Sequence, residues 1–161
     1  FEYISRTSLA LLLEAQDGLR HPLETTNEHY VLLEAATASP VLNLPEVIHE
    51  MLGGMIEAGT IIDGTIATSQ KQRAQFWHLR ENIPEAEVHF GGSIKHDIAV
   101  RTSLVAEFIV ACSEIVRSHA ENELLSIYGH VGDGNVHFNV VPPSGSDPVK
   151  FKQEFERDVS P

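Results

Sequence analysis

Hydrophobic and polar positions alternate on both sides of a glycine-rich turn signal near the C-terminal end of the chain. Gly-Asp-Gly-Asn at residues 132–135 separates two alternating runs, a pattern typical of a β-hairpin. A loop over 132–135 would place Val131 opposite Val136 and His130 opposite His137, with Cβ atoms about 4.5–5.5 Å apart in each pair. The polar face of this hairpin would also carry Tyr128 and Asn139. Its other face would be apolar, with Ile127, Phe138 and Val140.

The rest of the pattern interleaves helices with strands. Helical spacing of apolar residues predicts helices over 5–17, 45–58, 69–83, 103–119 and 148–158. Short apolar or β-branched runs predict strands over 30–36, 60–67 and 93–100. Asn43 and Ser69 are expected helix caps, and Pro45 suits a helix start. This order predicts an α+β fold of ferredoxin-like type, with helices packed on one face of a mostly antiparallel sheet.

Length and composition narrow the class of protein. The 161 residues fit one domain with a substantial core, and the net charge of −12 argues against binding a nucleic-acid backbone, which needs a basic face. No apolar run reaches the roughly 18 residues of a membrane span, and no signal-peptide pattern opens the chain. We therefore expect a cytoplasmic protein, with a mitochondrial location or a peripheral one at the inner membrane as the alternative.

Two further sequence features concern redox chemistry and completeness. Cys112 is the one cysteine, so no disulfide framework exists, and its apolar helical run favours a buried, unreactive thiol. The chain begins with Phe1 and stops at Ser160-Pro161 inside a charged helical pattern. We therefore expect it to be a piece of a longer polypeptide.

The polar face of the predicted hairpin is the strongest candidate for chemistry. Neutral imidazole is a common ligand of zinc and similar ions, so His130 and His137 could share one metal ion. Two ligands are too few, since a catalytic site usually has three from the protein and one open position. The third would have to come from elsewhere. The alternative is that both histidines are partly exposed polar residues near a turn.

Two cations stand out in an acidic chain that has eleven Lys and Arg against 23 Asp and Glu. Arg80, at the end of the predicted 69–83 helix, is either a surface residue favoured at a helix C-terminus or part of an anion site, for which its planar fork is suited. Lys95 shares a strand face with Asp97, so a salt bridge between them is the alternative to an anion site. His96 falls on the apolar face of the same predicted strand, where a core histidine is expected.

Three segments together resemble the C-terminal substrate domain of FAD-linked oxidases and dehydrogenases that act on 2-hydroxy acids, a family that includes D-lactate dehydrogenases, the glycolate oxidase FAD subunit and D-2-hydroxyglutarate dehydrogenase. They are Trp-His-Leu-Arg-Glu-Asn-Ile-Pro-Glu-Ala at 77–86, Ile-Lys-His-Asp-Ile-Ala-Val at 94–100 and Tyr-Gly-His-Val-Gly-Asp-Gly-Asn-Val-His-Phe-Asn at 128–139. The motifs occur in the right order and cover most of the chain.

The resemblance implies a role for each candidate residue. His130 and His137 correspond to ligands of a divalent metal, commonly zinc, Arg80 and Lys95 to groups that bind the substrate carboxylate, and Asn139 to a residue of the substrate pocket. The implied reaction oxidises a D-2-hydroxy acid to a 2-oxo acid: the metal polarises the hydroxyl, a base removes its proton, and the α-hydride passes to the flavin.

The same resemblance implies that other parts of the machinery lie outside this chain. The family's FAD-binding domain would precede Phe1, and a Glu-His pair supplying a third ligand and the base would follow Pro161, so no catalytic residue is expected within 1–161. The expected partners are a small 2-hydroxy acid, the FAD-binding domain and, as an option left open, a second copy in a homodimer. Nucleic acid is not expected.

The chain also departs from the family pattern in two places. Pro84 stands where some members have a substrate-contacting Thr, and Arg101 stands where the family continues into Pro. Two other readings stay open from sequence: a non-catalytic module that binds metal or small acids, and a purely structural role for the two histidines.

Overall fold

A five-stranded antiparallel sheet forms the centre of the molecule. The computed structural model describes residues 1–119 and 124–158. The sheet has the order β2-β1-β4-β5-β3, and every neighbouring pair is antiparallel. Its strands are β1 (Glu2–Ser5), β2 (His29–Leu32), β3 (Asp97–Ala99), β4 (Leu124–His130) and β5 (Asn135–Val141). The α+β class and the antiparallel sheet expected from the sequence are thus confirmed.

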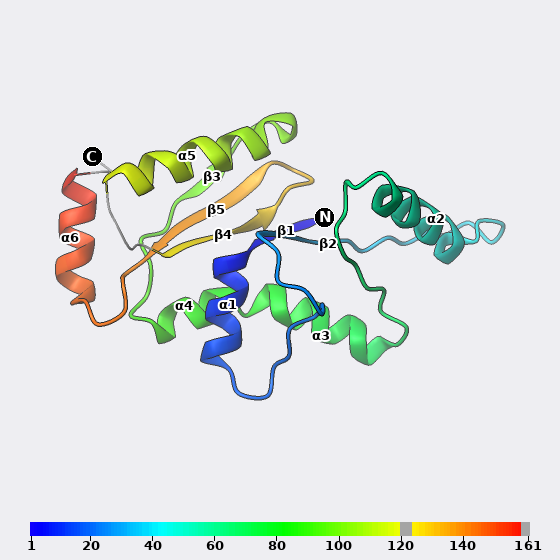
Figure 1. The fold of residues 1–161 in the computed structure, drawn as a ribbon, viewed down its shortest axis with the longest axis horizontal. Coiled ribbons are helices and arrows are strands. Elements are labelled where there is room, and N and C mark those ends of the chain that lie inside the picture. The colour runs from blue at the N-terminus through cyan, green and yellow to red at the C-terminus, as the bar shows by residue number, and fades with distance from the viewer. Residues whose placement is uncertain (120–123, 159–161) are drawn as a thin grey trace.

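Helices cover both faces of the sheet, whereas the sequence pattern predicts helices on one face. Helices α5 (Val105–His119) and α6 (Pro148–Asp158) pack over the apolar face of the hairpin through Val105, Ile109, Val116 and Phe155. On the other face, α1 (Arg6–Ala15), α3 (Gln70–Glu81) and α4 (Ile83–His89) form a second apolar cluster with β1 and β4. Figure 1 shows α5 on one side of the strands and the group of α1, α3 and α4 on the other.

The β4–β5 hairpin exists, but its register differs from the expected one. The turn occupies residues 131–134, one residue earlier than predicted, because Gly134 adopts a φ of 80° and ends the turn there. The register therefore moves by two residues, so that His137 lies opposite Tyr128 rather than His130. A shift by two keeps each side chain on its face. The direct pairing of the two histidines is wrong, while their shared face is confirmed.

Several element boundaries also differ from the pattern-based ones. The predicted helix over 5–17 begins after β1, because the Ser5 side chain accepts a hydrogen bond from the Ser8 backbone N–H and caps α1. Ser69 caps α3 as expected, but α3 ends at Glu81 and α4 starts at Ile83, with Pro84, which cannot donate to a continuing helix, in its first turn. The expected strand over 60–67 does not form, and the strand over 93–100 reduces to β3 and a bridge between Ile94 and Val140.

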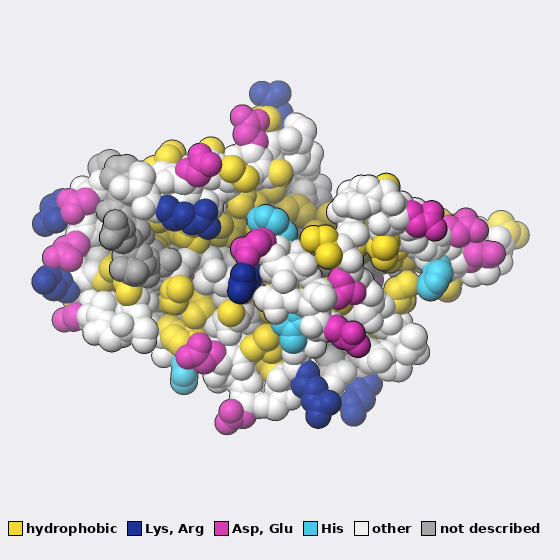
Figure 2. Space-filling view, in the orientation of Figure 1, with side chains coloured by type: hydrophobic (Ala, Val, Ile, Leu, Met, Phe, Trp, Pro, Cys, Tyr) yellow, Lys and Arg dark blue, Asp and Glu magenta, His cyan; other side chains and the backbone are white. Residues whose placement is uncertain are grey.

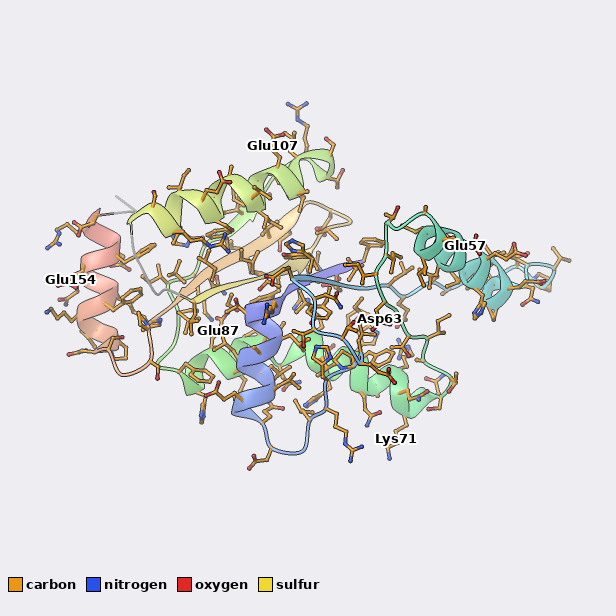
Figure 3. The ribbon with its side chains drawn as sticks, in the orientation of Figure 1. Glu57, Asp63, Lys71, Glu87, Glu107 and Glu154 are labelled. Carbon is orange, nitrogen blue, oxygen red and sulfur yellow. The ribbon has the colours of Figure 1, made fainter. Side chains whose placement is uncertain are left out.

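The segment between β2 and α3 forms an arm that projects from the sheet. Its helix α2 (Leu44–Glu57) buries none of its residues, and Asn43 donates to the Glu46 carboxylate instead of capping the helix through its side chain. Figure 2 shows hydrophobic and acidic side chains along this arm, and Figure 3 labels Glu57 and Asp63 on it. Across the described ranges, no helix combines the length and the apolar character that a membrane crossing would require.

Candidate functional site

A cleft of about 390 Å³ opens on the polar face of the hairpin, where β4 and β5 meet the α3–α4 junction and the chain leading into β3. It brings together all five residues singled out from the sequence: Arg80, Lys95, His130, His137 and Asn139. The other lining residues are Pro84, His96, Asp97 and Tyr128. Residues that are up to 59 positions apart in sequence thus line the same cleft.

A buried carboxylate, Glu2, ties two of these groups together. The Arg80 Nε–H donates to one oxygen of Glu2 at 2.8 Å, and His130 Nδ1 lies 2.6 Å from the other oxygen. Glu2 is 4% exposed and Arg80 is 7% exposed, so the surface alternative for Arg80 is wrong. The guanidinium carbon also lies 5.1 Å from the centre of the Tyr128 ring, within the range of a cation–π contact. Arg80 is therefore held in one orientation.

His137 lines the cleft from β5, the strand that lies between β3 and β4 in the sheet. Its Nδ1 is 3.5 Å from an oxygen of Asp97, its partner residue across the β3–β5 pair, and its ring centre is 4.9 Å from that of Tyr128. Burial lowers the pKa of His137 below its usual 6.5, with the nearby Arg80 and His130 acting in the same direction against Asp97. The imidazole is consequently neutral at neutral pH, which is the form that binds metals.

Asn139 is fixed at the floor of the cleft by four hydrogen bonds. Its Nδ2 donates to both oxygens of Glu87 at 3.1 Å and to the Tyr128 hydroxyl at 3.3 Å, and its Oδ1 accepts from the His96 backbone N–H at 3.3 Å. Glu87, labelled in Figure 3, is completely buried and also accepts from the Ser93 hydroxyl at 2.6 Å. Burial and this carboxylate raise the pKa of Tyr128 to about 12, so its hydroxyl stays protonated.

The approach to β3 places Lys95, His96 and Asp97 consecutively along the cleft, because the chain there is extended without regular strand alternation. The expected apolar position of His96 is wrong: its half-buried ring lines the cleft, and its Nδ1 donates to the Phe138 carbonyl at 3.0 Å. The alternative of a Lys95–Asp97 ion pair is not realised either. Within residues 1–119 and 124–158, no carboxylate pairs with Lys95.

The two cleft histidines fit the donor set of a divalent metal only in part. Each directs Nδ1 at a carboxylate, Glu2 for His130 and Asp97 for His137, which leaves both Nε2 atoms as available ligands. In the described part of the chain, however, no group of three or more His, Cys, Asp or Glu side chains is arranged to hold an ion. Among the described residues, the cleft thus presents two imidazole nitrogens but no complete set of metal ligands.

The pattern along the sequence did not reveal Glu2 or Glu87 as members of this site. Glu2 lies outside every predicted element, and only its pairing with His130 across β1 and β4 brings it to the cleft. Glu87 belongs to α4, a seven-residue helix that follows the end of the predicted 69–83 helix and that the pattern did not predict. The one available signal was the Tyr-Ile pair at residues 3–4, since both residue types are enriched in strands.

Cys112 takes no part in the cleft. It lies in α5 and packs against the apolar cluster on the other face of the sheet. Burial raises the pKa of its thiol above the usual value, which disfavours the reactive thiolate. The expectation of an unreactive thiol agrees with this position.

Comparison with known proteins places this chain in a recognised family. The family model for FAD linked oxidases, C-terminal domain, matches residues 1–154. The chain is 34% identical over 142 residues to the mitochondrial D-2-hydroxyglutarate dehydrogenase of Arabidopsis thaliana, covering 87% of this chain and 24% of that protein. The Danio rerio protein of the same name is 34% identical over 146 residues, which cover 89% of this chain and 26% of that protein.

A bacterial relative gives the same result. The D-2-hydroxyglutarate dehydrogenase of Stutzerimonas stutzeri is 32% identical over 151 residues, which cover 94% of this chain and 32% of that protein. The chain therefore spans 24% to 32% of the length of these curated relatives. Since the family model matches nearly the whole chain, the chain belongs to the family of C-terminal domains of FAD linked oxidases.

Proposed function

We propose that this chain is the substrate-binding domain of a flavin-dependent dehydrogenase that oxidises a D-2-hydroxy acid to the 2-oxo acid. The observation that carries the proposal is the cleft itself, in which Arg80 and Lys95 lie beside the imidazoles of His130 and His137. A 2-hydroxy acid carries a carboxylate next to a hydroxyl, and this cleft offers cations for the first and metal-binding nitrogens near the second. The names of the relatives make D-2-hydroxyglutarate the first substrate to test.

The charge of the cleft suits an acidic substrate. Among the described residues that line it, Arg80 and Lys95 are positive and Asp97 is negative. A divalent ion on His130 and His137 would add two positive charges beside these groups. Opposite charges attract strongly in a partly buried site, so such an ion and the acid would favour each other's binding.

Three residues of the cleft then have a defined task. Arg80 is held by Glu2 through Nε, so its two terminal nitrogens are oriented to bind the substrate carboxylate in a bidentate way. Lys95 adds a second positive charge at the exposed side of the cleft. Asn139 is rigidly fixed by Glu87 and Tyr128, and it shapes the floor against which the substrate carbon chain rests.

Two groups outside the polypeptide supply the remaining chemistry. A divalent metal, for which zinc is our candidate, would be held by His130 and His137 and would act as a Lewis acid on the substrate hydroxyl. FAD would accept the hydride, and we assign its binding to the FAD-binding partner domain that the family implies. The third metal ligand and the base that takes the hydroxyl proton are expected outside residues 1–161. The mitochondrial names of the plant and fish relatives support the mitochondrial alternative for location.

A substrate panel with one variant tests the proposal. The intact protein, loaded with FAD and zinc, is assayed with D-2-hydroxyglutarate, D-lactate and glycolate and an artificial electron acceptor. We expect turnover of at least one acid and a loss of activity on removal of metal by a chelator. Arg80→Ala should raise KM sharply because the carboxylate loses its main partner. Binding of these acids without any oxidation would instead favour a non-catalytic binding module.

A further inference from the structure

Glu2 makes a separate contact with each of its carboxylate oxygens. One oxygen accepts from the Arg80 Nε–H at 2.8 Å, and the other lies 2.6 Å from His130 Nδ1. The side chain of Glu2 is 5% exposed, so water competes little for either oxygen. One buried carboxylate from β1 therefore holds two cleft groups that come from α3 and β4.

We propose that Glu2 is a positioning residue that orients Arg80 and sets the tautomer of His130, so that Nε2 of His130 presents its lone pair to the cleft. The part of this inference that concerns metal binding rests on the proposed function. The tautomer of His130 depends only on residues of this chain.

The tautomer follows from the donors and acceptors present. An ionised carboxylate only accepts hydrogen bonds, so the imidazole must donate from Nδ1 at this short distance. In a neutral imidazole, a proton on Nδ1 leaves Nε2 unprotonated. The His130 side chain is 53% exposed and lines the cleft, so this nitrogen is accessible to a ligand. A metal-binding histidine commonly has such a carboxylate on its other nitrogen, and loss of that partner typically weakens metal binding about 10- to 100-fold.

The substitution Glu2→Gln should move the proton of His130 from Nδ1 to Nε2. The Arg80 Nε–H can only donate, so it takes the amide oxygen of the new side chain. The amide nitrogen must then face His130 Nδ1, where it can only donate. The imidazole responds by moving its proton to Nε2, the nitrogen that a metal would need. One substitution that preserves shape thus reverses the tautomer.

The chain offers a matched control in Glu28. Glu28 also accepts from an arginine, Arg6, at 2.6 Å, but both side chains are exposed and neither lines the cleft. Glu28→Gln makes the same chemical change without touching His130 or Arg80. We therefore expect it to leave both the tautomer and the metal affinity unchanged.

Nitrogen NMR of histidine-labelled intact protein measures the tautomer directly. Spectra are recorded without metal in alkaline buffer, and the His130 signals are assigned by their absence in His130→Gln. We expect protonated Nδ1 in the wild type and in Glu28→Gln, and protonated Nε2 in Glu2→Gln. A protonated Nε2 in the wild type, or an unchanged tautomer in Glu2→Gln, would overturn the inference. The wild-type spectrum is decisive by itself if Glu2→Gln does not fold.

Zinc titration of the same proteins separates this inference from the proposed function. We expect Kd to rise about 10- to 100-fold in Glu2→Gln and to stay unchanged in Glu28→Gln. Equal zinc affinity in Glu2→Gln and the wild type would refute the positioning of a metal ligand. If the wild type shows the expected tautomer but binds no zinc, the orienting role of Glu2 stands and the metal in the proposed function is wrong.

Discussion

Replacement of Arg80 by lysine preserves the positive charge in the cleft but removes the planar guanidinium group. In the structure, the guanidinium uses Nε for Glu2, and the described residues accept no hydrogen bond from its terminal nitrogens, which leaves these for a carboxylate. A lysine ammonium that pairs with Glu2 is a single point charge and cannot also form a planar, bidentate contact. We therefore expect Arg80→Lys to lose substrate binding although the buried ion pair remains.

The size of the effect follows from the hydrogen bonds lost. A hydrogen bond to a charged group contributes about 1.5–3 kcal/mol, which corresponds to a decrease in kcat/KM of about 10- to 150-fold. Most of it should appear as a higher KM, because Arg80 binds the carboxylate in the ground state as well. The free energy of unfolding should fall by less than the roughly 3–5 kcal/mol expected when one partner of a buried ion pair is removed.

Steady-state kinetics of the intact protein measures this effect, with Arg6→Lys as the control. Arg6 forms an exposed pair with Glu28, and such pairs contribute about 0–1 kcal/mol. We expect wild-type kinetics for Arg6→Lys. A kcat/KM of Arg80→Lys within threefold of the wild-type value, for an acid that the protein does oxidise, would refute the carboxylate role of Arg80.

Three further predictions concern neighbouring residues. The folded-state pKa of His137 lies below its usual 6.5, so protonation of this imidazole favours the unfolded chain. The metal-free protein should therefore lose free energy of unfolding as the pH falls through about 6.5. His137→Asn should flatten that decline in denaturant melts recorded between about pH 5 and pH 8. Pro84→Thr adds a hydroxyl to the cleft lining, so KM for D-2-hydroxyglutarate should fall about tenfold, whereas an unchanged KM would exclude contact between position 84 and the substrate. Asn139→Leu leaves buried Glu87 without two of its donor contacts and should lower the free energy of unfolding by about 3 kcal/mol in urea melts; a loss below about 1 kcal/mol would contradict the structural role of Asn139.

Local patterns in the sequence predicted most elements because those elements depend on local rules. The Gly-Asx turn between alternating runs predicted the β4–β5 hairpin, and the cap at Ser69 predicted the start of α3. The face shared by His130 and His137 also followed, because alternation fixes the face of each residue whichever even-numbered shift occurs. The exact register did not follow, because it depends on which residue of the turn adopts positive φ.

The pattern of apolar and polar residues did not predict which strands that are distant in the sequence pair with one another. Residues 60–67 have the β-branched composition of a strand, yet no neighbouring strand accepts them, and Ile62 is 79% exposed. Conversely, β1 is four residues long and belongs to the sheet only because β2 and β4 pair with it on either side. The position of Glu2 in the cleft is a consequence of that pairing, which explains why the candidate site was predicted without its buried carboxylate.

Reduction of the flavin under anaerobic conditions tests the central claim most directly. Intact protein loaded with FAD and zinc is mixed with D-2-hydroxyglutarate, and the loss of oxidised flavin absorbance is followed for the wild type, His130→Ala and the control Glu28→Gln. The account predicts rapid bleaching in the wild type and the control, and bleaching at least about 100-fold slower in His130→Ala, because a required group of the cleft is missing. Equal rates in all three proteins would contradict the assignment of this cleft as the site of hydroxy-acid oxidation.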